Sequence, residues 1–181
     1  MAAPLFTLAI LRGIVAGLVA GAVGAGAMSL VHKGLTAISS GNQPPPASAQ
    51  QAQDEDPTVK VADGVMRRLL RRPLPEDKKP LAGHLVHYAF GAGVGGLYGG
   101  LATVMPSVTA ALGVPFGAAV WLGAHVTMVP ALGLTAPPTR QPPLKEASEF
   151  VLHLVYGAVT ELARRGMRRT LDTIPTLTSG R

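Results

Sequence analysis

Long uncharged, apolar stretches separated by charged or proline-rich segments dominate the chain. Residues 13–31 and 81–105 carry no fixed charge, and no charged residue occurs from 106 to 139. A helix needs about 20 predominantly apolar residues to cross the hydrocarbon core of a bilayer. The pattern therefore predicts three membrane-spanning helices, at about 13–31, 81–105 and 114–134, and Pro130 is expected to kink the third.

A fourth candidate span, at about 144–165, has a shorter uncharged core. This core runs from 150 to 160, between Glu149 and Glu161. Seven apolar residues populate the region: Val151, Leu152, Leu154, Val155, Ala158, Val159 and Leu162. We interpret the region as a fourth transmembrane helix, which makes the chain an all-α integral membrane protein with four transmembrane helices.

These spans divide the chain into three regions. Residues 1–34 contain the first span, residues 35–80 form a polar loop, and residues 81–181 contain the other three spans and a basic C-terminal tail. The first half of the loop, residues 40–56, consists of proline, alanine, glutamine, serine, acidic and a few other small or polar residues. Such a composition cannot bury a core and predicts a disordered linker.

The second half of the loop predicts an amphipathic helix. Asp56 followed by Pro57 is typical of a helix N-cap and first turn. The apolar residues share one arc of this helix: Val61, Val65 and Leu69 beside Ala62, Met66 and Leu70. The opposite arc carries Arg67, Arg68 and Arg71. The helix either lies in the membrane interface with these arginines toward anionic headgroups, or packs on the loop side of the protein itself.

Small residues recur every four positions within the spans. The rows are Gly13, Gly17, Gly21, Ala25 and Ser29 in the first span, Gly83, Gly91, Gly95 and Gly99 in the second, and Ala119, Gly123, Thr127 and Ala131 in the third. Helices in lipid associate through close van der Waals contact, which such rows permit. The rows predict a tightly packed bundle, with contacts either inside one chain or between copies in a homo-oligomer.

Ionisable side chains inside the spans are the candidate functional residues. They are His87, His125, Glu149, His153 and Glu161, and those of the fourth span share one helix face. Because an ionisable group facing lipid costs about 3 kcal/mol or more, this face is expected to point into the bundle. Three interpretations remain open: a structural hydrogen-bond network, a proton or ion pathway, and a metal site.

The metal interpretation has the least support from spacing. Glu149 and His153 are four residues apart, and His84 and His87 are three apart, but no His-xxx-His or cysteine pair accompanies them. We therefore expect neither a metal nor another cofactor.

Composition agrees with a membrane protein. The 181 residues are 48% hydrophobic and only 14% charged, which is too apolar for an ordinary soluble domain. Cysteine is absent, which excludes disulfides and thiolate chemistry. The net charge of +6 accompanies few aromatic residues and flanks the spans, so it indicates a lipid bilayer as the partner and not nucleic acid. No nucleophile-elbow, phosphate-loop or dinucleotide motif occurs, and we expect no enzyme.

One combination of residues resembles a known family. Its members in order are His87, Tyr98, Pro106, His125, Pro130, Gly133-Leu134-Thr135, Pro137-Pro138, Ser148-Glu149, His153-Leu154-Val155, Glu161 and Arg164-Arg165. Over about residues 80–170 this order resembles the YagU-like family of bacterial inner-membrane proteins, whose shared region has no assigned function. The resemblance implies multi-pass insertion in the bacterial cytoplasmic (inner) membrane with cytoplasmic termini, and it supplies no catalytic or cofactor-binding residues.

Two functional hypotheses follow from the sequence. The first is a structural or membrane-stress-related helical bundle without enzymatic activity. The second is a proton or small-ion pathway along the histidine and glutamate face, with membrane metal binding as a further alternative.

Overall fold

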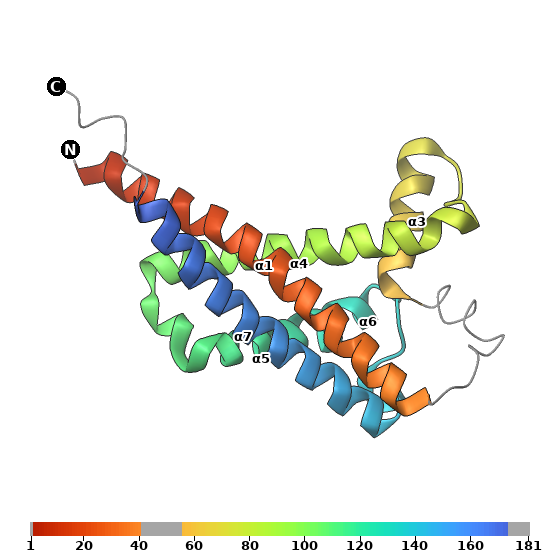
Figure 1. The fold of residues 1–181 in the computed structure, drawn as a ribbon. Helices are drawn as coiled ribbons and strands as arrows, with labels where there is room; N and C mark the ends of the chain where they lie inside the picture. Colours follow the sequence, from red (N-terminus) through yellow and green to blue (C-terminus); the bar gives the residue numbers. More distant parts are fainter. Residues whose placement is uncertain (1, 41–55, 174–181) are drawn as a thin grey trace.

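Helices make up nearly all of the computed structural model, which describes residues 2–40 and 56–173 (Figure 1). The α-helices are α1 (Ala2–Ser40), α3 (Pro57–Leu70), α4 (Lys79–Val104), α5 (Val114–Val120), α6 (Val129–Ala131) and α7 (Pro143–Thr173). Three 3₁₀ segments, η1 (Glu76–Lys78), η2 (Pro106–Gly113) and η4 (Pro138–Arg140), and one π-helix, η3 (Trp121–Met128), connect or extend them. No strand occurs in these residues, so the predicted all-α class is confirmed.

The three long helices α1, α4 and α7 form the body of the molecule (Figure 1). Helix α4 runs antiparallel along α1, because Gly13 lies beside Thr103 at one end and Ser29 beside His87 at the other. Helix α7 also runs antiparallel to α1, and Gly24 packs on Thr160. The contacts of α1 with α4 and with α7 therefore extend over several successive turns.

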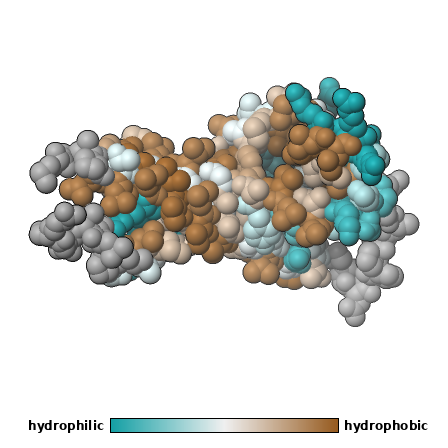
Figure 2. Space-filling model, turned by 90° about the horizontal axis from the view of Figure 1, so that it is seen from above, coloured by the Kyte–Doolittle hydropathy of each residue, from teal (hydrophilic) through white to brown (hydrophobic). Residues whose placement is uncertain are grey.

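Small side chains fill the centre of this body, and large apolar side chains cover its outside. Ala16 and Ala20 are fully buried, whereas Leu97 is 76% exposed and Leu30 is 71% exposed. Figure 2 shows apolar residues over most of the visible face, with hydrophilic residues gathered at the end where α3 lies and a smaller group near the opposite end. This distribution is the reverse of that in a soluble protein, in which large apolar residues are the most often buried.

Two helical segments of the described residues are long and apolar enough to cross a membrane, Leu5–Ile38 and Pro106–Ala131. Helices α4 and α7 are also long, with 26 and 31 residues. Helix α4 contains glycines and two histidines, and α7 contains charged residues at several positions.

The third predicted span differs from the expected single helix at 114–134. It begins at Pro106 with η2 and continues through α5, η3 and α6. At the end of η2, just before α5, the chain turns through Ala111, Leu112 and Gly113, all of which have positive φ. Pro130, the predicted kink, lies in the short helix α6, which follows the π-helix and ends one residue later, at Ala131.

Helix α3 lies across α4 and outside the three-helix body (Figure 1). The Asp56 side chain accepts a 2.8 Å hydrogen bond from the backbone N–H of Thr58, so Asp56 is the N-cap that the sequence predicted. Val59 and Ala62 are buried together with Leu74, against the first turns of α4. Residues 41–55, most of the predicted linker, lie outside the described residues.

Candidate functional site

The predicted glycine rows of α1 and α4 face each other. Gly17 lies against Gly95 and Gly99, and Gly21 lies against Gly91 and Gly95. A Cβ atom on Gly17 or Gly21 would fall inside the backbone of α4, and one on Gly95 or Gly99 would fall inside the backbone of α1. The structure thus brings all five predicted packing glycines into one interface within a single chain.

A second glycine contact joins the third span to α7, and the sequence analysis missed it. Gly113 and Gly117 lie against Gly157, with backbone atoms of each helix in the place where a Cβ would stand. In the row predicted for this span, Gly123 has open space around it within the single chain. The spacing of Gly113 and Gly117, four residues apart, was the signal that could have revealed the contact.

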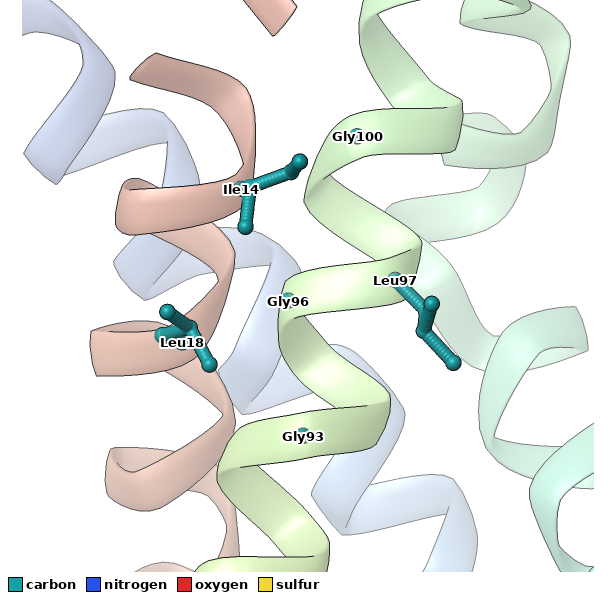
Figure 3. Close-up of a pocket in the computed structure, with 6 residues that line it drawn as sticks. All are labelled: Ile14, Leu18, Gly93, Gly96, Leu97 and Gly100. Carbon is teal, nitrogen blue, oxygen red and sulfur yellow. The ribbon is translucent and has the colours of Figure 1, made fainter. Parts of the chain in front are cut away.

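An apolar pocket of about 270 Å³ lies along α1 and α4 (Figure 3). Its lining consists of Ile14, Leu18, Gly93, Gly96, Leu97 and Gly100. Since no polar side chain reaches into it, the pocket offers no group for catalysis or for recognition of a polar substrate.

Glu161 is the centre of a buried ionic cluster. Its side chain has no exposed surface, and its carboxylate accepts a 2.9 Å hydrogen bond from the Tyr98 hydroxyl. Arg164 donates to both carboxylate oxygens, at 2.7 and 2.9 Å, and Arg165 donates through Nε at 2.6 Å. The guanidinium of Arg164 also lies 5.8 Å from the centre of the Tyr98 ring. Four donors therefore satisfy the two carboxylate oxygens.

His125 and His153 belong to a separate cluster between η3 and α7. His125 Nε2 lies 3.1 Å from a carboxylate oxygen of Glu146, and the rings of His125 and His153 meet edge to face at 5.8 Å. Trp121 stacks on His125 at 6.3 Å. Glu146, which was not among the candidate residues, thus takes the place expected for Glu149 as the acidic partner.

The remaining candidates do not complete a single site. Glu149 bonds to His153 through its backbone carbonyl, at 2.7 Å from Nδ1, and not through its carboxylate. The His87 ring lies in the α1–α4 interface, 3.3 Å from the carbonyl oxygen of Ala25. His153 and Glu161 are eight residues apart on α7, which is about 12 Å along a helix. The ionisable residues therefore form distinct clusters.

No group of three or more metal-ligand side chains comes together within residues 2–40 and 56–173. The side chains of the two sequence pairs considered for metal binding have other partners, since His153 bonds to the backbone carbonyl of Glu149 and not to its carboxylate. His84 is exposed and bonds to the carbonyl oxygen of Pro80 at 2.6 Å, away from His87.

The three predicted headgroup-contacting arginines lie on the exposed side of α3 and at its end. Arg67 pairs with Asp63 at 2.6 Å, whereas Arg68 and Arg71 are exposed. The Arg67 guanidinium, together with the backbone N–H of Leu74, holds the pKa of the Asp63 carboxyl below its usual value. Asp63 therefore fixes the turn after α3 in addition to its pairing with Arg67.

The fold and these clusters define an all-helical protein with two segments apolar enough to cross a membrane. Residues 36–162 match the family model described as "Protein of unknown function (DUF1440)", and the chain belongs to this family. The matched region holds α4 with its glycines, but it begins after the glycines of α1. No curated protein and no solved structure matches the chain.

Proposed function

We propose that this chain is a non-catalytic, multi-pass membrane protein that acts as a structural helical bundle. Its four spanning segments are α1, α4, Pro106–Ala131 and α7. The observation that carries the proposal is the glycine interface between α1 and α4, which brings two helix backbones into contact while large apolar side chains remain outside. Such an arrangement is typical of helices that associate in lipid, where the solvent itself is apolar.

The charges of α1 support a spanning position. Arg12 and Lys33 enclose twenty residues without a fixed charge. At 1.5 Å per residue these residues extend over about 30 Å, the thickness of the hydrocarbon core. The antiparallel contacts of α4 and α7 with α1 support a spanning position for these two helices as well.

The proposed membrane and the orientation of the chain in it rest on the family resemblance. The likeness of the chain to the YagU-like family of bacterial inner-membrane proteins supports a bacterial inner membrane with both termini in the cytoplasm. A role in maintaining the membrane under stress suits a bundle whose buried carboxylate, that of Glu161, is occupied by donors of the protein itself. A homo-oligomer would use the exposed outer faces of α1 and α4.

A proton or ion pathway is the second candidate, favoured by the pair of His125 and Glu146 beside His153. Against a continuous pathway stands the separation of this cluster from Glu161. Tyr156 lies between them, and its hydroxyl donates to the backbone carbonyl of Gly91 at 2.7 Å, which joins helices. Metal binding has less support, since the histidines and acids do not converge as ligands within the described residues.

Membrane insertion and proton flux test the proposal together. The chain has no cysteine, so the single variant Leu97→Cys reports on the outer face of α4 alone. We expect the protein to resist extraction from membranes by alkaline carbonate and the cysteine to be shielded from a membrane-impermeant maleimide. Purified protein in liposomes should give no proton flux above that of empty liposomes.

Release by carbonate would refute the spanning bundle. Flux that Glu146→Gln and His125→Ala both abolish would replace the structural role with conduction, whereas flux that persists in both variants would indicate a leak unrelated to this cluster.

A further inference from the structure

Part of the apolar surface of α3 has no partner within the described residues. Ala62 and Met66 face α4, but Val65 is 51% exposed, Leu69 is 74% exposed and Leu70 is 61% exposed. Moving these three apolar side chains out of water would be favourable, so an amphipathic helix of this kind is more stable when a partner covers them. The packing on α4 therefore accounts for only one of its two apolar edges.

The depth of α3 in the bundle can be read from its contacts. Val59 of α3 packs on Gly83 of α4. Gly83 is four residues before His87, which lies beside Ser29 of α1. Because α1 and α4 are antiparallel, Gly83 stands level with Lys33, where the uncharged stretch of α1 ends. Helix α3 thus crosses α4 at the edge of the proposed hydrocarbon layer (Figure 1).

The charged residues beside the exposed apolar edge are arginines that form no ion pair in the described part of the chain. Arg68, Arg71 and Arg72 are exposed, and none has an acidic partner in the described residues. The one acid within α3, Asp63, is occupied by Arg67 and by the backbone of Leu74. An apolar edge with unpaired arginines beside it, at the depth of the headgroups, matches an anionic lipid surface.

We infer that α3 is an interfacial helix whose partner is the anionic phospholipid headgroups of the membrane that holds the bundle. Val65 and Leu69 enter the boundary between headgroups and acyl chains, and Arg68, Arg71 and Arg72 bind the phosphates. This inference rests on the proposed membrane-spanning bundle. It selects one partner for the helix, because a neutral surface would leave the three arginines unpaired.

Site-specific labels in the full chain test the inference. We would attach an environment-sensitive fluorophore to Leu69→Cys and, as the matched control on the arginine side of the same helix, to Gly64→Cys, which has open space around it. Each protein is reconstituted in phosphatidylcholine vesicles and in vesicles that contain equal parts of phosphatidylcholine and phosphatidylglycerol. Quenching by lipid-attached nitroxide and by aqueous iodide then measures the depth of each label.

We expect the Leu69 label to be quenched from the lipid in the anionic vesicles, and the Gly64 label to remain open to iodide. Replacing Arg68, Arg71 and Arg72 by glutamine should lower the embedding equilibrium constant of the Leu69 label on the order of 100-fold, at about 1 kcal/mol for each basic residue. High salt should weaken embedding in the same direction.

A label on Leu97→Cys separates the two proposals. If it is embedded while the Leu69 label stays open to iodide in both vesicles, the interfacial helix is refuted and the bundle stands. If the Leu97 label is itself open to iodide, the spanning bundle fails. Shielding of Leu69 that follows the protein-to-lipid ratio, and not the lipid charge, would assign the edge to a second copy of the chain and overturn the inference.

Discussion

The α1–α4 interface predicts that one added methyl group will destabilise the protein at Gly95 and not at Gly93. A Cβ at Gly95 would lie 2.5 Å from the carbonyl oxygen of Gly17 and 2.6 Å from the Cα of Gly21. Both neighbours are backbone atoms, so no side-chain rotation relieves the overlap. At Gly93, two residues earlier on α4, nothing lies within 4 Å of the added atom.

The size of the effect follows from these distances. Close carbon–oxygen contacts in proteins lie at about 3.3 Å or more, and carbon–carbon contacts at about 3.5 Å or more, so the helices must separate by roughly 1 Å. Overpacking of this kind costs about 1–3 kcal/mol. We expect a cost at the upper end of this range, because separating α1 from α4 at Gly95 also weakens the contacts of Gly17 and Gly21. Alanine in place of glycine returns up to about 1 kcal/mol of helix propensity.

Gly95→Ala should therefore lower the free energy of unfolding by about 2 kcal/mol, whereas Gly93→Ala should leave it unchanged or raise it by up to about 1 kcal/mol. The measurement is unfolding in mixed micelles by titration with sodium dodecyl sulfate, followed by far-ultraviolet circular dichroism. Equal midpoints for the two variants would show that α1 and α4 do not touch through their backbones, and would refute the reasoning.

Three further predictions concern the second interface, the buried cluster and the turn after α3. Gly117→Ala should destabilise in the same assay, because its Cβ meets the carbonyl oxygen of His153, and Gly123→Ala should not. Tyr98→Phe should lower stability by about 1.5–3 kcal/mol, the range for a hydrogen bond to a charged group; an unchanged midpoint would contradict the buried network. The pKa of Asp63 is lowered in the folded state, so its stabilisation is complete above its unfolded pKa of about 3.9 and is lost as the pH falls through the lower folded value. Hydrogen exchange in α3, corrected for intrinsic rates, should show this acid-dependent loss, and Asp63→Asn should remove the dependence.

The packing of α1 on α4 could be predicted because its cause is local and periodic. Gly17 and Gly21 are one turn apart, as are Gly91, Gly95 and Gly99, and a four-residue period keeps each set on one helix face. The helix cap at Asp56 was predictable for the same reason, since it depends only on the neighbouring residues of the chain.

The path of the third span could not be derived in this way. Ala111 and Leu112 adopt positive φ, a conformation that is unfavourable for most residues other than glycine. Neither alanine nor leucine prefers it, so the residue types did not predict the turn. After this turn α5 continues into the π-helix η3, which has more residues per turn and so interrupts the four-residue period; Gly117 faces α7, whereas Gly123 has open space around it. A period read along the chain is informative only while the helix continues without a break.

The separation of the ionisable residues has a similar origin. On α7 alone, Glu149, His153 and Glu161 share a face, and the sequence placed them in one site. Their partners come from different elements: Tyr98 of α4 reaches Glu161, while His125 of the π-helix reaches the region of His153. Which partner meets which residue depends on the depth at which each helix crosses α7, and that is a tertiary property.

The glycine contacts and the buried carboxylate depend on each other. A carboxylate taken out of water costs several kcal/mol unless charges and hydrogen bonds compensate it. Here Arg164 and Arg165 of the same helix supply the charges, and Tyr98 of α4 adds a hydrogen bond. Gly113 lies beside this contact, with its Cβ position 3.2 Å from the Tyr98 hydroxyl and 2.8 Å from the Cβ of Glu161. A larger residue there would push α7 away from Tyr98, and Glu161 would keep only the donors of its own helix, Arg164 and Arg165. Close backbone packing at Gly113 is therefore what allows α4 to contribute a donor to the charge that α7 buries.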